Sequence, residues 1–222
     1  MNKLFNIDSP IMMGLSRMTE MVLLSVLWFA CCLPIITIGP STTALYYVSM
    51  KLERNEDVKI VPTFFRAFKE NFKQAVALNL IFLVVITILF LDYFYMSGVD
   101  GTYGTISSVC FFVMGIWTLC SMFYAYPLQA QFFNTVRQTL INAALLSMRK
   151  IVTTIIVFIL NMLPVIVAFL SFEVFVRTAP IWVLLAPGLI AAICSKLFVR
   201  LFDPFLKAAQ GMPGKDDGKE EE

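Results

Sequence analysis

Five long stretches of the chain contain no charged residue, and this feature constrains the fold more than any other. Each holds 18 residues or more, and a helix needs about 20 apolar residues to cross roughly 30 Å of hydrocarbon. A charge at mid-bilayer costs about 2.5–3.5 kcal/mol, whereas one Leu, Ile, Phe or Val returns only about 0.3–0.6 kcal/mol. The sequence therefore predicts an all-α, polytopic membrane protein. The stretches are Met21–Met50, Gln74–Leu91, Gly101–Val136, Ile151–Phe172 and Thr178–Ser195.

The composition agrees with a bundle of about five transmembrane helices. The chain is 59% hydrophobic, and its mean hydropathy is +0.81. In a water-soluble domain the charges would be interspersed along every helix, but here they cluster between the apolar stretches. We expect one transmembrane domain over residues 1–210 and a disordered polar tail over residues 211–222. The expected spans cover about 21–38, 75–96, 105–128, 151–172 and 178–198.

Several classes of function are disfavoured by what the chain lacks. It has no histidine, which is the commonest general base and metal ligand, and its net charge of +2 does not suit a nucleic-acid binder. The cysteines all fall within apolar stretches and form no CxxC motif, so we expect neither a metal site nor a disulfide framework. Without a phosphate-binding loop or a central carboxylate pair, we expect no enzyme and no cofactor. The cysteines are Cys31, Cys32, Cys110, Cys120 and Cys194.

The lysines and arginines predict an orientation. When they are counted on alternate sides of five spans, 14 fall on one side and three on the other. Because cytoplasmic loops carry the excess of positive charge, this count places the N-terminus outside and the C-terminus in the cytoplasm.

The first apolar stretch contains a motif that interrupts a helix, formed by Pro34, Thr37, Gly39 and Pro40. Proline lacks the amide donor, so we expect the helix to break between residues 33 and 41. Three hydroxyl residues, 41–43, are expected to cap a new helix over about 44–52. The motif is typical either of a discontinuous helix lining a site or of a helix that ends near the cytoplasmic surface. An earlier helix start is expected at Asp8–Pro10.

The loop after this stretch contains a basic and aromatic pattern. On a helical wheel, four phenylalanines share one face and three basic residues lie opposite them. This pattern predicts an amphipathic helix at the membrane surface. The alternative is the cytoplasmic end of the second span, with its phenylalanines packed on neighbouring helices. The residues are Phe64, Phe65, Phe68 and Phe72 on one face and Arg66, Lys69 and Lys73 on the other.

A few polar residues fall inside the expected spans, among them Asn79, Gln129 and Asn161. Hydrogen bonds between helices are their default role in a membrane. No span has a carboxylate at its centre, and this disfavours a proton- or sodium-coupled transporter.

Several segments resemble the YesL-like family of bacterial membrane proteins. The resemblance covers nearly the whole chain and is most specific in the first 75 residues; Ser25 departs from it, since an asparagine is expected there in many relatives. It implies a multi-pass protein of the bacterial cytoplasmic membrane, linked to carbohydrate uptake and without an established activity. The segments are Phe5–Pro10, Cys31–Tyr46, Phe64–Lys73, Tyr126–Leu128 and Arg200–Asp203.

Two functions therefore remain as expectations. The first is an accessory or regulatory component of carbohydrate ABC-type uptake, whose partners are the lipid bilayer and a sugar permease. The second is a small transporter or channel for a sugar or another small solute, which five spans would require to act as a homo-oligomer. Neither involves nucleic acid.

Overall fold

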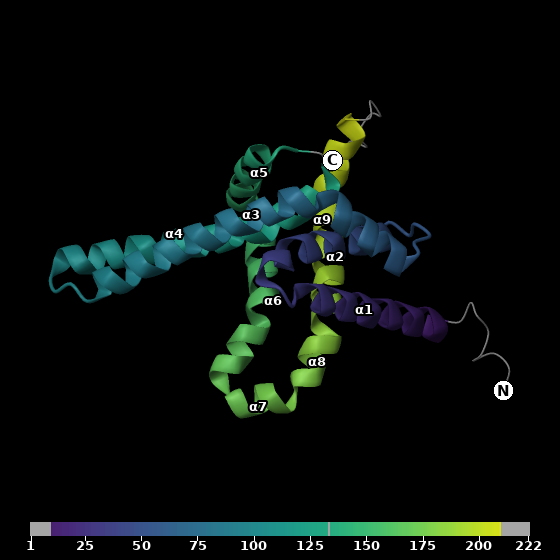
Figure 1. Ribbon diagram of the computed structural model, residues 1–222, viewed down its shortest axis with the longest axis horizontal. Coiled ribbons are helices and arrows are strands. Elements are labelled where there is room, and N and C mark those ends of the chain that lie inside the picture. The colour runs from purple at the N-terminus through teal and green to yellow at the C-terminus, as the bar shows by residue number, and fades with distance from the viewer. Residues whose placement is uncertain (1–9, 133, 210–222) are drawn as a thin grey trace, which may run out of the picture.

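The computed structural model describes residues 10–132 and 134–209, and every regular element in these ranges is a helix (Figure 1). The all-α prediction is confirmed. The expected tail, 211–222, and the residues Asp8 and Ser9 of the expected helix start lie outside the described residues. The elements are α1 (Pro10–Cys32), the 3-10 helix η1 (Ile35–Thr37), α2 (Ile38–Glu53), α3 (Ile60–Ser97), α4 (Thr102–Gln131), α5 (Val136–Arg149), α6 (Ile151–Leu170), α7 (Phe172–Arg177), α8 (Ala179–Leu184) and α9 (Ala186–Ala209).

Four of the described helices are long and apolar enough to cross a membrane: α1 from Leu15, α3, α4 and α6. The chain is therefore a polytopic membrane protein. The expected fifth span, 178–198, is not one helix, because the chain breaks at Leu185 between α8 and α9. Six residues are too few to span, and the second half of α9 carries charged residues. The described part thus contains four single-helix candidates, and the stretch expected as a fifth span is divided between α8 and the first half of α9.

The helices form three antiparallel pairs. Hydrogen bonds between residues far apart in the sequence show how the first pair is aligned. In the first pair, Trp28 donates a hydrogen bond to Thr42 (3.1 Å) near the turn, and Arg17 donates one to the Leu52 carbonyl (3.0 Å) at the other end. In the second pair, α3 and α4 lie side by side along most of their length (Figure 1). The third pair, α6 and α9, is connected by α7 and α8 and touches only briefly, because α9 packs mainly on α1 and α2.

The first pair brings together two segments that the sequence analysis separated. Arg17 precedes the expected first span, and Asn55 follows it. The structure joins them by a hydrogen bond of 2.9 Å from the Arg17 guanidinium to Asn55 Oδ1. The two segments therefore lie side by side at the same end of the α1–α2 pair. The physical reason is that α2 returns alongside α1 instead of continuing outward.

Helix α3 is a single helix of 38 residues, about 57 Å long at 1.5 Å per residue. It contains both the basic and aromatic segment and the expected second span. Gly101, at φ 103°, allows the turn into α4, and a Cβ on Gly104 would lie 2.9 Å from the Val99 carbonyl carbon. Figure 1 shows the far halves of α3 and α4 extending away from the other helices, while α6 and α8 extend in another direction.

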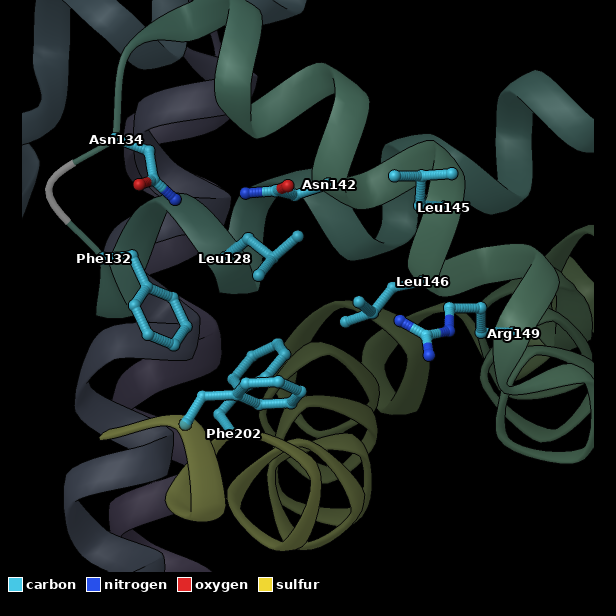
Figure 2. A pocket seen from close by; sticks show the side chains of 9 residues that line it. Leu128, Phe132, Asn134, Asn142, Leu145, Leu146, Arg149 and Phe202 are labelled. Carbon is cyan, nitrogen blue, oxygen red and sulfur yellow. The ribbon is translucent and has the colours of Figure 1, made fainter. Parts of the chain in front are cut away.

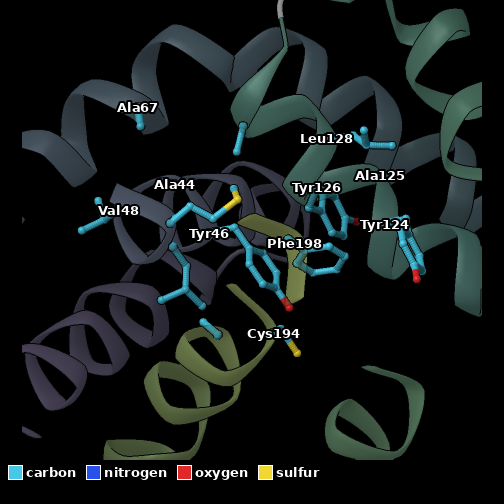
Figure 3. Close-up of a cluster of buried hydrophobic side chains, with 14 of the residues drawn as sticks. Ala44, Tyr46, Val48, Ala67, Tyr124, Ala125, Tyr126, Leu128, Cys194 and Phe198 are labelled. Carbon is cyan, nitrogen blue, oxygen red and sulfur yellow. The ribbon is translucent and has the colours of Figure 1, made fainter. Parts of the chain in front are cut away.

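The core lies where the three pairs meet. The Phe198 ring of α9 contacts Tyr46 of α2 and Tyr124 of α4 edge to face, with centroid distances of 5.7 and 5.3 Å. Phe202 stacks on Phe198 one turn further along α9. Figure 3 shows the rings of Tyr46, Tyr124 and Phe198 between the three helices. Edge-to-face aromatic pairs contribute about 0.5–1.5 kcal/mol beyond the area they bury.

The close approach of α2 to α3 yields the first prediction. A Cβ on Gly39 would lie 2.5 Å from the Ala75 carbonyl oxygen and 2.9 Å from Asn79 Cβ. We expect Gly39→Ala to destabilise the protein by about 1–3 kcal/mol, because two backbones would have to separate. Thermal unfolding in mild detergent measures this.

Gly115→Ala is the matched control, because a Cβ at Gly115 meets nothing within 4 Å. Alanine should be neutral or slightly stabilising there, given its higher helix propensity. Equal unfolding temperatures for the two variants would contradict the tight contact at Gly39.

Candidate functional site: polar junctions between the helix pairs

The helix break is closed by hydrogen bonds from its own residues. Helix α1 ends at Cys32, before Pro34, and the Thr37 hydroxyl donates to the carbonyls of Cys31 and Pro34, each at 2.7 Å. The Thr37 amide also bonds the Pro34 carbonyl, at 3.0 Å. The new helix begins at Ile38, earlier than expected, so Gly39 and Pro40 lie in its first turn. Proline is tolerated there because the first amides of a helix have no partner within it.

Asn79 of α3 closes the rest of the break. Its amide nitrogen donates to the Ile35 carbonyl at 3.0 Å, and its Oδ1 accepts from the Tyr126 hydroxyl of α4 at 3.0 Å. Asn79 is buried, so both of its polar ends are used inside the protein. Together with the close contact at Gly39, this makes the break a packed junction of α2, α3 and α4 rather than the wall of an open site.

Gln129 forms a second buried junction between α3, α4 and α5. Its amide nitrogen donates to Gln74 Oε1 and, at 3.4 Å, to Asn71 Oδ1. Its Oε1 accepts from the Thr139 hydroxyl at 3.0 Å. Helix α5 is held in register for this contact by a capping box, in which the Thr135 side chain and Gln138 bond each other's backbone amides.

Asn161 has a smaller role than the other two expected polar residues. Its amide donates to the Val157 carbonyl of its own helix at 2.8 Å and lies 3.9 Å from Cys194 Sγ of α9. A bond within one helix does not join helices. Asn161 therefore contributes less to the assembly than Asn79 or Gln129.

A charged junction lies where α2 and α4 end, beside the C-terminal part of α9. The Arg54 guanidinium donates to Gln131 Oε1 at 2.9 Å and to Asp203 Oδ1 at 2.9 and 3.2 Å. These residues follow α2, end α4 and lie in α9, respectively. Sequence reasoning missed this junction, because only tertiary structure pairs residues so far apart in the chain. Nearby, Glu56 hydrogen-bonds Lys51 and raises the pKa of that ammonium.

The basic and aromatic segment is the first part of α3 and not a separate helix. Phe64 is fully buried in the core, and Phe68 is half-buried with its ring 5.5 Å from that of Phe72. Phe65 and Phe72 point outward, so the four rings do not share one environment. On the opposite face Lys69 and Lys73 are exposed.

Arg66 shares that exposed face and pairs with Glu70 one turn along the helix, at 2.8 Å. A pair so exposed contributes little to stability.

Two cavities lie beside these junctions. Figure 2 shows one of about 320 Å³ between the end of α4, α5 and α9, with Leu128, Leu146 and Phe202 inside and Arg149 at its edge. The other, about 430 Å³, lies between α1, α2 and α9. Its lining is mixed, with apolar side chains and charges of both signs, from Arg17, Glu20, Glu53 and Lys196.

The second cavity also presents polar atoms without partners. The Ser49 hydroxyl lines it, is buried, and bonds no other group in the described chain; the same holds for Glu20 Oε2. Among the described residues, no group of three His, Cys, Asp or Glu side chains could hold a metal ion. The cavity can therefore offer hydrogen bonds to a polar molecule.

Comparison with known proteins identifies one related family. Residues 21–93 match the family described as "Protein of unknown function, DUF624". The match covers about a third of the chain and includes the helix break, Arg54 and Asn79. No similar curated protein and no similar solved structure was found. The chain is thus a polytopic membrane protein with a segment shared with a family of unknown function.

The Asn79 junction gives the second prediction. Asn79→Ala removes the partners of the Ile35 carbonyl and of the Tyr126 hydroxyl, and Tyr126→Phe removes one bond only. We expect Asn79→Ala to lower the free energy of unfolding by about 1–3 kcal/mol, because it leaves buried polar groups without partners. Tyr126→Phe should lower it by only about 0.5–1 kcal/mol, because interhelical hydrogen bonds in membranes average near 0.6 kcal/mol.

A double-mutant cycle over the two substitutions isolates their coupling. Thr87→Val is the control, since the Thr87 hydroxyl bonds only the carbonyl of Leu83 on the exposed side of α3. Additive effects of Asn79→Ala and Tyr126→Phe would contradict the interhelical bond.

Proposed function

We propose that this protein is a non-catalytic component of the membrane that acts by associating with another membrane protein, the permease of a carbohydrate ABC-type importer. The partner class is supported by the resemblance to YesL-like proteins. The mode of association is supported by the α3–α4 pair. The second half of α3 and the first half of α4 extend away from the other helices, and most of the large apolar side chains in these halves are exposed (Figure 1).

A groove on this pair carries the proposal. It has a volume of about 240 Å³ and is lined by apolar and aromatic side chains, among them Phe90, Phe112 and Ile116. Gly115 lies at its floor, where a Cβ would meet nothing within 4 Å, so internal packing does not require glycine at this position. Small residues let a partner helix approach closely in a membrane. The groove is therefore shaped to receive side chains of a second transmembrane helix.

Gly115→Leu tests this function. We expect the variant to fold with an unchanged unfolding temperature and to lose the permease in purification from native membranes under mild detergent. Leu185→Ala, in the break between α8 and α9, is a control away from the groove and should retain the partner. A wild-type protein that purifies without any permease would contradict the proposal.

A second candidate function, a small-solute transporter, is favoured by the cavity between α1, α2 and α9. A sugar is neutral and carries many hydroxyls. The charges of both signs, together with the free Ser49 and Glu20 oxygens, suit such a molecule. Counterflow of radiolabelled sugar in proteoliposomes measures this activity.

Glu20→Gln should weaken sugar binding about ten-fold or more, because a hydrogen bond to a charged group is replaced by a neutral one. Glu70→Gln, on the surface of α3, should leave binding unchanged. If the wild-type protein shows no counterflow, the transporter function is contradicted and only the accessory function remains.

A further inference from the structure

We propose that α1 and α2 form a re-entrant membrane hairpin. Both of its ends lie on the cytoplasmic side, and its apolar tip, residues 33–36, is embedded among the acyl chains of the inner leaflet. The N-terminal segment is then cytoplasmic, like the C-terminal one. This placement differs from the orientation expected from sequence and is independent of the proposed function.

The ends of the hairpin show that both lie on one side. Arg17, in the first half of α1, bonds the Leu52 carbonyl at 3.0 Å and Asn55 Oδ1 at 2.9 Å. Asn55 takes a positive φ of 55° in the turn that follows α2, and Arg54 beside it joins the charged junction with Asp203. The chain therefore leaves and returns to the same polar layer.

The depth of the tip follows from its contact with α3. Asn79 donates to the Ile35 carbonyl at 3.0 Å. Asn79 lies six residues beyond Lys73, the last charged residue of α3 before Asp92. At 1.5 Å per residue the tip is at most about 9 Å past Lys73 and roughly 20 Å short of Asp92. The tip is thus inside the apolar stretch, on the cytoplasmic side of its middle.

Three carbonyls at the tip have hydrogen-bond partners within the protein. Pro34 has no amide hydrogen, and the carbonyls of Cys31, Pro34 and Ile35 all accept hydrogen bonds, from Thr37 and Asn79 among others. Non-helical backbone at membrane depth is tolerated only with such partners. In a turn exposed to water, solvent would bond the Ile35 carbonyl and Asn79 would not be needed for it.

The side chains of the tip point away from the protein. Leu33, Ile35 and Ile36 are 75%, 65% and 53% exposed. Exposure of three large aliphatic side chains within four residues is unfavourable in water and favourable among acyl chains. Their exposure identifies lipid as the occupant of this surface.

The charge distribution supports the same placement. With the hairpin ends on one side, and with α8 and the first half of α9 crossing together, 16 of the 17 lysines and arginines are cytoplasmic. Arg177 alone in the sequence is outside. This asymmetry exceeds the 14 to three of the five-span count and follows the positive-inside rule more closely.

Single cysteines in a cysteine-free background test the hairpin. The positions are Ser16→Cys at the N-terminal end, Asp57→Cys after α2, Ile36→Cys at the tip and Asp100→Cys between α3 and α4; all four side chains are exposed in the structure. The probe is a membrane-impermeant maleimide, applied to intact cells and to inverted vesicles. We expect Ser16→Cys and Asp57→Cys to react only in inverted vesicles and Asp100→Cys only in cells.

Ile36→Cys should react in neither preparation, and a nitroxide on it should collide with oxygen rather than with a water-soluble nickel chelate. Reaction of Ser16→Cys from outside would overturn the cytoplasmic N-terminus. Reaction of Ile36→Cys from outside would show that the pair crosses the membrane fully, and reaction in inverted vesicles would show that the tip lies in water. Either result would overturn the re-entrant hairpin.

Discussion

The guanidinium of Arg54 holds together the ends of α2 and α4 and the C-terminal part of α9. It follows α2 and bonds the end of α4 through Gln131 and the C-terminal part of α9 through Asp203. A delocalised, permanently charged group with several donors can hold two acceptors from different helices at once. Because a charge is costly in hydrocarbon, the helix ends that meet at Arg54 share one polar layer. The aromatic core of Tyr46, Tyr124 and Phe198 lies close to this junction.

Inside the apolar layer, the structure depends on hydrogen bonds to the carbonyls that the helix break leaves without a helical partner. The break after α1 would expose carbonyls to lipid if Asn79 and Thr37 did not bond them. The same side chain, Asn79, also receives the Tyr126 hydroxyl, so one buried amide ties α3 and α4 to the hairpin. Close backbone contact at Gly39 completes the junction. In the structure the helix-break motif is a packed contact between α2, α3 and α4.

The surfaces that remain for function are therefore elsewhere. The far halves of α3 and α4 present an apolar groove above Gly115, and the cavity between α1, α2 and α9 presents unpaired polar atoms. The first surface suits a helix of another membrane protein, and the second suits a neutral polar solute. The two surfaces share no lining residue, so variants can alter one without removing a side chain of the other.

The sequence by itself determined the class of protein and the places where helices stop. Long charge-free stretches are favourable in hydrocarbon, and Pro34 removes an amide donor from the first of them, so the membrane helices and the break after Cys32 could be predicted. Only the tertiary structure decided that α2 returns beside α1, that Phe65 and Phe72 face outward while Phe64 is buried, and that Arg54 meets Asp203. The direction that the chain takes after a helix break depends on which distant groups hydrogen-bond the carbonyls that the break leaves without a helical partner. Asn79 is 44 residues from Ile35, and no local pattern specifies that partner.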